Sequence, residues 1–232
     1  MTIKREYIDG KYFSNNPSFH LEDSPWKANQ IAKLIGRNRI SPISIAEVGC
    51  GAGEILVQLE KNLPFINYTG YELSPQGYEL CKIRESERIH YRNSDIFDND
   101  KKYDLLLCID VLEHIEDYFS FLRSLINKAD FHVFHIPLDM NMQMVARSKP
   151  ILSVRRQVGH IHYFSKDTAM ATLRECGYEI IDWFYTSEGV DRPKSRKARL
   201  LKFPRLMLQR VNVEMTARLL GGYSLLVLTK PI

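Results

Sequence analysis

The stretch "AEVGCGAGEI", residues 46–55, places three glycines within five positions directly after an apolar run. Glycines at the turn between a strand and a helix leave the backbone bare, so that a ligand can approach it closely. The turn is not a Walker loop, because no lysine follows the glycines. It also departs from the dinucleotide pattern G-x-G-x-x-G, because Glu54 stands at the third glycine position and opposes a pyrophosphate. The turn therefore favours a ligand other than a phosphate ester.

The composition is that of an ordinary globular protein. The chain has 232 residues, of which 44% are hydrophobic and 26% charged, which is enough for one domain with a sizeable core. Because the N-terminus lacks an apolar signal segment and no apolar run is long enough to cross a bilayer, we expect a cytoplasmic protein. The cysteines form no C-x-x-C pair and are expected to be buried thiols. They are Cys50, Cys81, Cys108 and Cys176.

Predicted strands and helices alternate along most of the chain, which indicates an α/β fold with a doubly wound, seven-stranded, mostly parallel sheet. Strands are expected at 43–48, 66–73, 88–93, 103–111, 131–137, 178–186 and 223–230. Helices are expected at 23–38, 53–63, 75–86, 118–128 and 165–177. We expect a single domain, made of an N-terminal segment and helix (1–40), a core (41–186), an insertion (187–221) and a final strand (222–232).

The insertion, residues 187–221, interrupts this alternation. A polar, basic loop is expected first, followed by an amphipathic helix that begins at Pro204 and ends at Gly221. Its apolar residues recur at intervals of four: Met207, Val211, Met215 and Leu219.

Positive charge is concentrated in residues 192–210. The segment has eight basic residues and no acidic one: Arg192, Lys194, Arg196, Lys197, Arg199, Lys202, Arg205 and Arg210. The whole chain has 32 basic and 28 acidic residues, so the rest of the chain carries a net charge of −4. Such a segment is typical of a solvated loop, or of a surface that binds an anionic acceptor or the surface of a membrane.

Three further motifs follow the glycine turn in order. "GYELS" places Glu72 at the tip of the second strand, "NSDIF" places Asp95 and Ile96 after the third, and "DVLEHI" follows the fourth. Together with "EVGCGAG", they resemble the motifs of the class I S-adenosylmethionine-dependent methyltransferases, over residues 25–186 and 222–230. The resemblance implies a Rossmann-like fold with an antiparallel last strand, and an enzyme that converts S-adenosyl-L-methionine to S-adenosyl-L-homocysteine.

The resemblance also implies a donor site, in which Glu72 holds the ribose hydroxyls and Asp95 accepts from the adenine amino group, with Ile96 beside the ring. Carboxylates suit this ligand on independent grounds, because its sulfonium and ammonium groups are cationic and its ribose offers two hydroxyls. Glu47 is expected beside the ammonium group. The residues expected to bind the donor are Glu47, Gly49, Cys50, Gly51, Gly53, Glu72, Leu73, Asp95, Ile96, Asp110 and Val111.

Candidates for catalysis lie in two segments. Asp110, Glu113 and His114 share one face if the chain turns helically after the fourth strand. His114 is the preferred base, because imidazole titrates near neutral pH, although Glu113 and His114 are equally suited to bracing the loop. In "GHIHYFS", His160 and His162 point to one side of an extended chain, as further candidate catalytic residues or as bracing residues.

The pattern carboxylate-x-x-Glu-His with a later histidine raises a metal alternative. It resembles the metal site of the small-RNA 3′-end 2′-O-methyltransferases, and part of it recurs in ubiquinone-pathway O-methyltransferases. A Mg²⁺ or Mn²⁺ ion there would lower the pKa of two neighbouring hydroxyls. Asp110 replaces the glutamate usual at the first position, and metal-free relatives share "DVLEH", so no residue is assigned as a metal ligand.

The chain looks most similar to bacterial methyltransferases of small molecules and glycans, which predicts O-methylation of a saccharide or another small hydroxylated metabolite. An anionic acceptor, contact with a membrane surface through 192–210, and a homodimer stay open. Nucleic acid is not expected, because no dedicated RNA-binding module is visible. The alternatives are an RNA 2′-O-methyltransferase-like enzyme with a divalent metal, an S-adenosylmethionine-binding interaction protein without catalysis, and a nicotinamide oxidoreductase.

Overall fold

The computed structural model describes residues 10–19, 21–193 and 196–232. Its centre is a seven-stranded sheet in the order β3-β2-β1-β4-β5-β7-β6, parallel except for β7, which runs antiparallel to both neighbours. The predicted doubly wound fold with an antiparallel last strand is confirmed. The strands are β1 Ser44–Val48, β2 Asn67–Tyr71, β3 Ile89–Arg92, β4 Tyr103–Ile109, β5 Ala129–Pro137, β6 Tyr178–Thr186 and β7 Ser224–Pro231.

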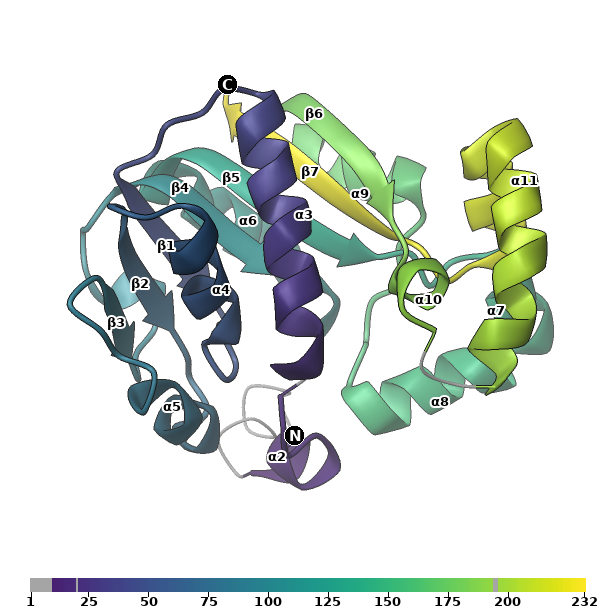
Figure 1. Ribbon diagram of the computed structural model, residues 1–232, viewed down its shortest axis with the longest axis horizontal. Coiled ribbons are helices and arrows are strands. Elements are labelled where there is room, and N and C mark those ends of the chain that lie inside the picture. Colours follow the sequence, from purple (N-terminus) through teal and green to yellow (C-terminus); the bar gives the residue numbers. More distant parts are fainter. Residues whose placement is uncertain (1–9, 20, 194–195) are drawn as a thin grey trace.

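Helices cover both faces of the sheet (Figure 1). One face carries α3 Ser24–Arg37, α4 Glu54–Asn62 and α5 Pro75–Lys82, and the other carries α6 Tyr118–Leu125 and α9 Lys166–Glu175. The sequence of the central strand β4 is apolar throughout because both of its faces are buried. Leu105 and Leu107 pack on the first face, and Leu106 and Cys108 pack on the second. All four cysteines are buried and free, as expected.

Local capping explains where two of these helices begin. Ser74 precedes α5 and its hydroxyl accepts the Gly77 N–H at 3.2 Å, next to a proline at the first helical position. Ser165 precedes α9 and accepts the Thr168 N–H at 3.3 Å, while the Thr168 hydroxyl accepts the Ser165 N–H at 3.0 Å. These caps fix the helix starts that the sequence predicts.

Four helices outside the central alternation form a helical lobe beside the β5–β7 side of the sheet (Figure 1). They are α7 Met142–Arg147, α8 Lys149–Val158, α10 Glu188–Asp191 and α11 Arg196–Leu220. The first three were not predicted from the sequence; α7 and α10 have only 6 and 4 residues. A further short helix, α2 Lys11–Asn15, lies under α8, where the Asn16 amide donates to the Gln157 carbonyl at 3.1 Å.

The expected start of the inserted helix at Pro204 is wrong. Helix α11 begins at Arg196, because the Arg-, Lys-, Ala- and Leu-rich stretch before Pro204 favours helix strongly enough to absorb one proline. Most of the basic segment is therefore helical. Its Lys194 lies outside the described residues, and so does the side chain of Lys197. The helix kinks at Asn212, whose side chain accepts the Met215 N–H at 2.9 Å and so starts a second helical stretch.

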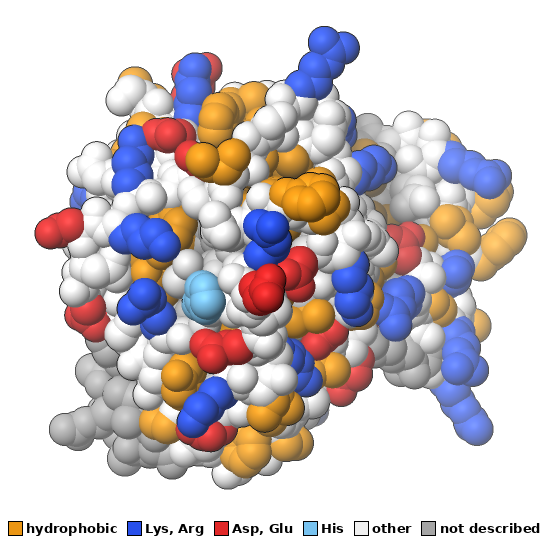
Figure 2. Space-filling view, turned by 60° about the vertical axis from the view of Figure 1, so that its left-hand side comes forward, with side chains coloured by type: hydrophobic (Ala, Val, Ile, Leu, Met, Phe, Trp, Pro, Cys, Tyr) orange, Lys and Arg blue, Asp and Glu red, His pale blue; other side chains and the backbone are white. Residues whose placement is uncertain are grey.

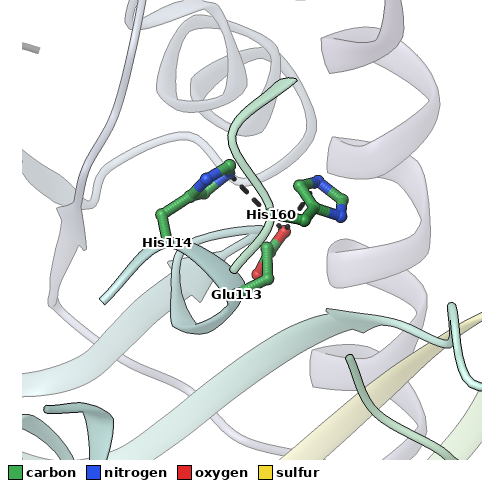
Figure 3. A group of neighbouring side chains, drawn as sticks. All are labelled: Glu113, His114 and His160. Atoms are coloured by element: carbon green, nitrogen blue, oxygen red, sulfur yellow. Dashed lines mark ion pairs between the residues drawn. The ribbon is translucent and has the colours of Figure 1, made fainter. Parts of the chain in front are cut away.

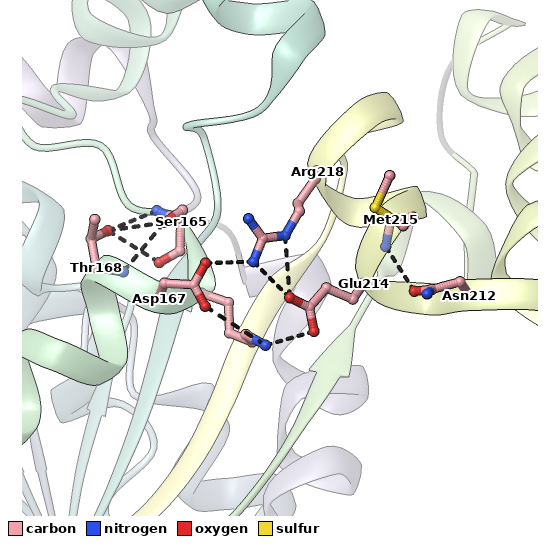
Figure 4. A network of polar contacts seen from close by, with 8 residues as sticks. Ser165, Asp167, Thr168, Asn212, Glu214, Met215 and Arg218 are labelled. Carbon is pink, nitrogen blue, oxygen red and sulfur yellow. Dashed lines mark hydrogen bonds and ion pairs between the residues drawn. The ribbon is translucent and has the colours of Figure 1, made fainter.

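A network of charges ties this second stretch to α9 (Figure 4). Lys166 on α9 lies 2.6 Å from Glu214, and Arg218 reaches both Glu214 at 2.6 Å and Asp167 at 2.5 Å. A network of this kind fixes an orientation more than it adds stability, because its members are partly exposed. No helix among the described residues is long and apolar enough to cross a membrane.

Candidate active site

A cavity of about 790 Å³ lies at the carboxyl ends of β1, β2, β4 and β5. This is the point where the strand order reverses between β1 and β4, which is where open α/β sheets bind their ligands. One half is lined by the glycine turn and the tips of β1 and β2. The other half is lined by the segments after β4 and β5 and by α8.

The glycine turn is shaped by its backbone. Gly49 and Gly51 have φ values of 67° and 56°, which favour glycine, and both line the cavity. The N–H groups of Gly49 and Cys50 donate to the Tyr71 carbonyl at 2.8 and 3.1 Å, which fastens the turn to β2. Gly53 does not line the cavity. Its φ is 77°, and a Cβ there would lie 2.6 Å from the Tyr91 ring, so packing explains this glycine.

Glu72 is buried beside the turn, as the motif predicts. Its carboxylate accepts the Gly51 N–H at 2.8 Å and the Ser74 N–H at 2.7 Å. Burial raises the pKa of Glu72 to about 7, against the opposing effect of these backbone hydrogen bonds. The Glu72 carboxylate therefore faces the cavity, where its oxygens are suited to accept hydrogen bonds from the hydroxyl groups of a ligand.

Glu47 and Asp95 complete this half of the cavity. Glu47 is buried at the end of β1, and its Oε2 has no hydrogen-bond partner among the described residues. Burial raises the pKa of Glu47 well above the usual range. A cationic group of a ligand beside this carboxyl would therefore favour its ionised form. Asp95 precedes a short 3₁₀ helix, Ile96–Asp98, and caps it through the Phe97 N–H at 3.3 Å. Ile96 is fully buried behind it, and Leu73 also lines the cavity.

Asp110 does not join Glu113 and His114 on one helical face, contrary to expectation. It has a φ of 54°, and the short 3₁₀ helix Leu112–His114 begins only after it. Its carboxylate instead pairs with Lys27 of α3 at 2.7 Å and with His135 of β5 at 2.5 Å. His135 and Lys27 outweigh burial and hold the pKa of Asp110 well below its usual range. The sequence analysis missed both partners, because nothing local marks a lysine of an earlier helix as a cavity residue.

Glu113, His114 and His160 come together from two segments 45 residues apart (Figure 3). The Glu113 carbonyl accepts the N–H groups of Ile161 and His162 at 2.8 and 3.2 Å, which holds the two segments side by side. Glu113 Oε1 lies 3.9 Å from His114 Nε2 and 3.8 Å from His160 Nε2. These three groups are the ones whose ligand atoms lie close enough together to hold a metal ion, among the residues described.

The opposite ring nitrogens of both histidines are occupied. His114 Nδ1 lies 3.1 Å from the Gly159 carbonyl, and His160 Nδ1 lies 2.7 Å from Asp139 Oδ2. Because a carbonyl and a carboxylate oxygen accept, each Nδ1 is the hydrogen-bond donor, and the Nε2 atom of each ring is directed toward Glu113. Neither carboxylate oxygen of Glu113 has a hydrogen-bond partner among the described residues. The cluster is therefore a site for a proton or a cation.

Burial, together with the charge of Asp110, raises the pKa of Glu113 well above its usual range. Asp139 was also missed, although it follows β5 directly and so lies at the expected edge of the sheet. His162 lies outside the cavity lining. Its Nε2 is 3.3 Å from the Glu116 carbonyl and its ring packs on Tyr118, so it braces the loop in this structure.

The cavity as a whole is acidic. Among the described residues, Lys27 is the one lysine or arginine in its lining, and Asp110 pairs with it. The lining acids are Asp23, Glu47, Glu72, Asp95, Asp110, Glu113, Glu116, Asp117, Asp139 and Glu188. A cationic ligand is favoured inside such a cavity, and an anionic one is disfavoured.

Comparisons with known proteins indicate a methyltransferase domain. A sequence profile described as a methyltransferase domain matches residues 26–182. The ubiquinone biosynthesis O-methyltransferase of Rickettsia bellii is 30% identical over 134 residues, which cover 54% of this chain and 55% of that protein. That of Vibrio campbellii is 30% identical over 108 residues, 43% of this chain and 45% of that protein. The chain thus spans about half the length of the curated relatives it matches.

Solved structures share the fold at low identity. The magnesium protoporphyrin IX methyltransferase of Synechocystis PCC 6803, with bound SAH, superposes with a TM-score of 0.61 at 14% identity, covering 90% of this chain and 83% of that one. The cyclopropane synthase MmaA2 of Mycobacterium tuberculosis gives 0.60 at 14% identity, covering 88% and 84%. The chain belongs to the methyltransferase-domain family, and it shares the fold of a methyltransferase solved with bound SAH.

Proposed function

We propose that the protein transfers the methyl group of S-adenosylmethionine to a hydroxyl oxygen of a saccharide or another small hydroxylated metabolite. The single observation that carries the proposal is the position of the His160 ring, which lines the cavity while Asp139 lies 2.7 Å from its Nδ1. A hydroxyl acceptor needs such a base, because it must lose a proton as it attacks. The curated relatives named above are O-methyltransferases, which supports oxygen as the acceptor atom.

The donor is proposed to occupy the half of the cavity formed by the glycine turn. Its ribose hydroxyls would donate to Glu72, its ammonium group would lie near Glu47, and its adenine would lie between Asp95 and Ile96. Gly49, Cys50 and Gly51 would let the aminoacyl chain approach the backbone. The acidic lining suits this ligand, because its sulfonium and ammonium groups are both positive.

The reaction would be an in-line displacement. The acceptor oxygen forms a bond to the methyl carbon while the carbon–sulfur bond breaks, and the sulfur keeps the electron pair and becomes a neutral thioether. The acceptor proton passes to His160 Nε2, and the positive charge of that imidazolium is stabilised by the Asp139 carboxylate at Nδ1. Alignment of the two reactants supplies much of the rate, about 7–11 kcal/mol in favourable cases.

The acidic lining also narrows the acceptor. An anionic group inside the cavity would meet several carboxylates and one lysine that is already paired, so the part of the acceptor that enters should be neutral. An anionic portion of a larger acceptor, such as a phosphate on a saccharide, would have to remain outside. Cavity residues Val154 and Val158 of α8 offer an apolar wall for a sugar or aromatic ring.

A second use of the cluster is favoured by the convergence of two imidazole lone pairs and one carboxylate. Glu113, His114 and His160 would hold a divalent ion, and such an ion lowers the pKa of a bound hydroxyl. Two imidazoles with one carboxylate suit Mn²⁺ or another transition metal better than Mg²⁺, which prefers oxygen ligands. A metal-dependent RNA 2′-O-methyltransferase-like activity would use the same cluster, although the acidic cavity disfavours a phosphate backbone.

The experiment that tests the proposal is incubation of cell extract with isotopically labelled methyl donor, followed by mass spectrometry of the products. We expect a labelled O-methyl group on a small hydroxylated compound with the wild-type protein and loss of that product with His160→Ala. Label on nitrogen or carbon would contradict the proposal. Donor binding without any labelled product would instead support an interaction protein without catalysis.

A further inference from the structure

Two stretches of the helical lobe, one containing α7 and α8 and the other the first part of α11, lack acidic residues. Residues 140–166 and 192–213 contain no aspartate or glutamate, and α7 packs against both α8 and α11, so the two stretches meet in space. Within these two stretches, the described basic residues that are both helical and exposed are Arg147, Lys149, Arg155, Arg156, Arg196, Arg199 and Arg210. The surface formed by these stretches is therefore positive, while the cavity beside it is acidic.

Helix α11 adds large apolar side chains to this charge. Leu200, Phe203 and Val211 are 77%, 70% and 86% exposed, and Met207 is 52% exposed. Spacings of three, four and four residues place all four on one side of the helix, with Arg196, Arg199 and Arg210 on or beside that side. Figure 2 shows hydrophobic and basic side chains next to each other on the lobe at its right. Isolated exposed apolar residues are common, but a stripe of this length is not.

The opposite side of α11 holds the helix in this orientation. Arg205 is buried and donates to the Leu220 carbonyl at 3.1 Å, so this arginine of the basic segment is unavailable to a partner. Beyond the kink, Lys166 and Arg218 join Glu214 to α9. The apolar stripe therefore cannot turn inward without breaking these contacts.

We propose that the outward side of α11, with the adjoining basic residues of α7 and α8, binds the surface of an anionic phospholipid bilayer. Leu200, Phe203 and Val211 insert at the level of the acyl chains, and the flanking arginines contact lipid phosphates. Amphipathic helices with arginine and lysine beside large apolar residues bind membranes in this way, and each basic residue near the surface adds to the attraction. The proposal does not depend on which acceptor the enzyme methylates.

Two other partners fit the surface less well. A second copy of the chain, docked through the same side by two-fold symmetry, would place arginines against arginines with no acid to compensate. A nucleic acid would satisfy the charge but gain nothing from Leu200, Met207 and Val211, since bases stack on aromatic rings and Phe203 is the one aromatic residue of the stripe.

The test is flotation of the full chain with vesicles of phosphatidylcholine alone and with about 30% phosphatidylglycerol, at about 0.1 M NaCl. We expect binding to the anionic vesicles only, and weaker binding at about 0.5 M NaCl. The charge variant Arg199→Glu/Arg210→Glu should lower the partition coefficient more than about tenfold. The apolar variant Phe203→Ser/Val211→Ser should lower it comparably, because it removes the inserted side chains.

The matched control is Lys61→Glu/Lys82→Glu, which changes the same charge at exposed lysines of α4 and α5, far from the lobe (Figure 1). It should bind anionic vesicles within about twofold of wild type. S-adenosylhomocysteine affinity and the midpoint of thermal unfolding, measured for every variant, show whether the fold and the donor site are intact. Absence of vesicle binding by wild type, equal loss in the control, or tighter binding to RNA than to vesicles would overturn the proposal. Failure of donor binding would instead contradict the proposed function alone.

Discussion

His160 Nδ1 lies 2.7 Å from Asp139 Oδ2, and the opposite nitrogen of the ring faces Glu113 across 3.8 Å. The carboxylate thus selects the tautomer in which Nε2 is free to take a proton, and it fixes the plane of the ring. Asp139 acts through His160 and touches no reacting atom in the proposed reaction. It is a positioning residue, and its contribution can be separated from that of donor binding.

Asp139→Asn should reduce kcat about 10- to 100-fold, because an amide stabilises the imidazolium less and holds the wrong tautomer equally well. S-adenosylhomocysteine affinity, measured by calorimetry, should stay within about twofold of wild type. The pH–rate profile should shift toward lower pH, since the ring loses the anion that favours its charged form. A variant with full turnover and an unchanged profile would assign Asp139 to loop structure only.

Donor affinity should depend on pH through Glu72. Its pKa is raised to about 7 in the free protein, and in the proposed donor site the ionised form would accept both ribose hydroxyls. Lowering the pH from 8 to 6 protonates most of this carboxyl, so S-adenosylhomocysteine should bind about tenfold more weakly at pH 6. Glu72→Gln should bind weakly at both pH values, without this slope. A wild-type affinity that stays constant between these pH values contradicts the assignment.

Alanine substitutions at Gly53 and at Gly36 should change the free energy of unfolding in opposite directions. Gly53→Ala places a Cβ 2.6 Å from the Tyr91 ring at a φ of 77°, which should cost more than about 2 kcal/mol of unfolding free energy. Gly36→Ala lies in α3 with no heavy atom within 4 Å of the new Cβ, and should add up to about 1 kcal/mol. Urea denaturation monitored by circular dichroism measures both. Equal stability of the two variants would mean that the turn is not tightly packed.

Chelation of metal ions distinguishes two mechanisms at the cluster of Glu113, His114 and His160. In one, His160 is the base without a metal, and in the other the cluster binds a metal ion. If His160 acts as a base without a metal, EDTA should change turnover by less than about twofold, and added Mn²⁺ should have no larger effect. A metal-assisted mechanism predicts different results: EDTA abolishes turnover, Mn²⁺ restores it, and Glu113→Gln abolishes Mn²⁺ binding. These results would contradict the role of His160 as the base.

The donor half of the cavity was predictable from the sequence, because each motif is local and follows directly after a strand. Glu47, Gly49 and Glu72 lie where the strand ends place them. The half lined by the segments after β4 and β5 was only partly predictable, because its contacts join distant segments. The sequence places Glu113 beside His114, but not His160 beside both, and it gives no sign that Lys27 pairs with Asp110.

The expected start of α11 failed for a different reason. Proline is usually a boundary, and Pro204 has the right place for a first helical residue, yet the residues before it favour helix and α11 already begins at Arg196. The real break lies at Asn212, where a side chain that caps the next turn competes with the helical hydrogen bond.

Donor binding in the acidic cavity at the glycine turn can be tested by a crystal structure with S-adenosylhomocysteine. We expect the aminoacyl chain against residues 47–53, both ribose hydroxyls within hydrogen-bond distance of Glu72, and the sulfur directed toward His160. A ligand bound elsewhere on the molecule, or a ribose out of reach of Glu72, would contradict this binding mode.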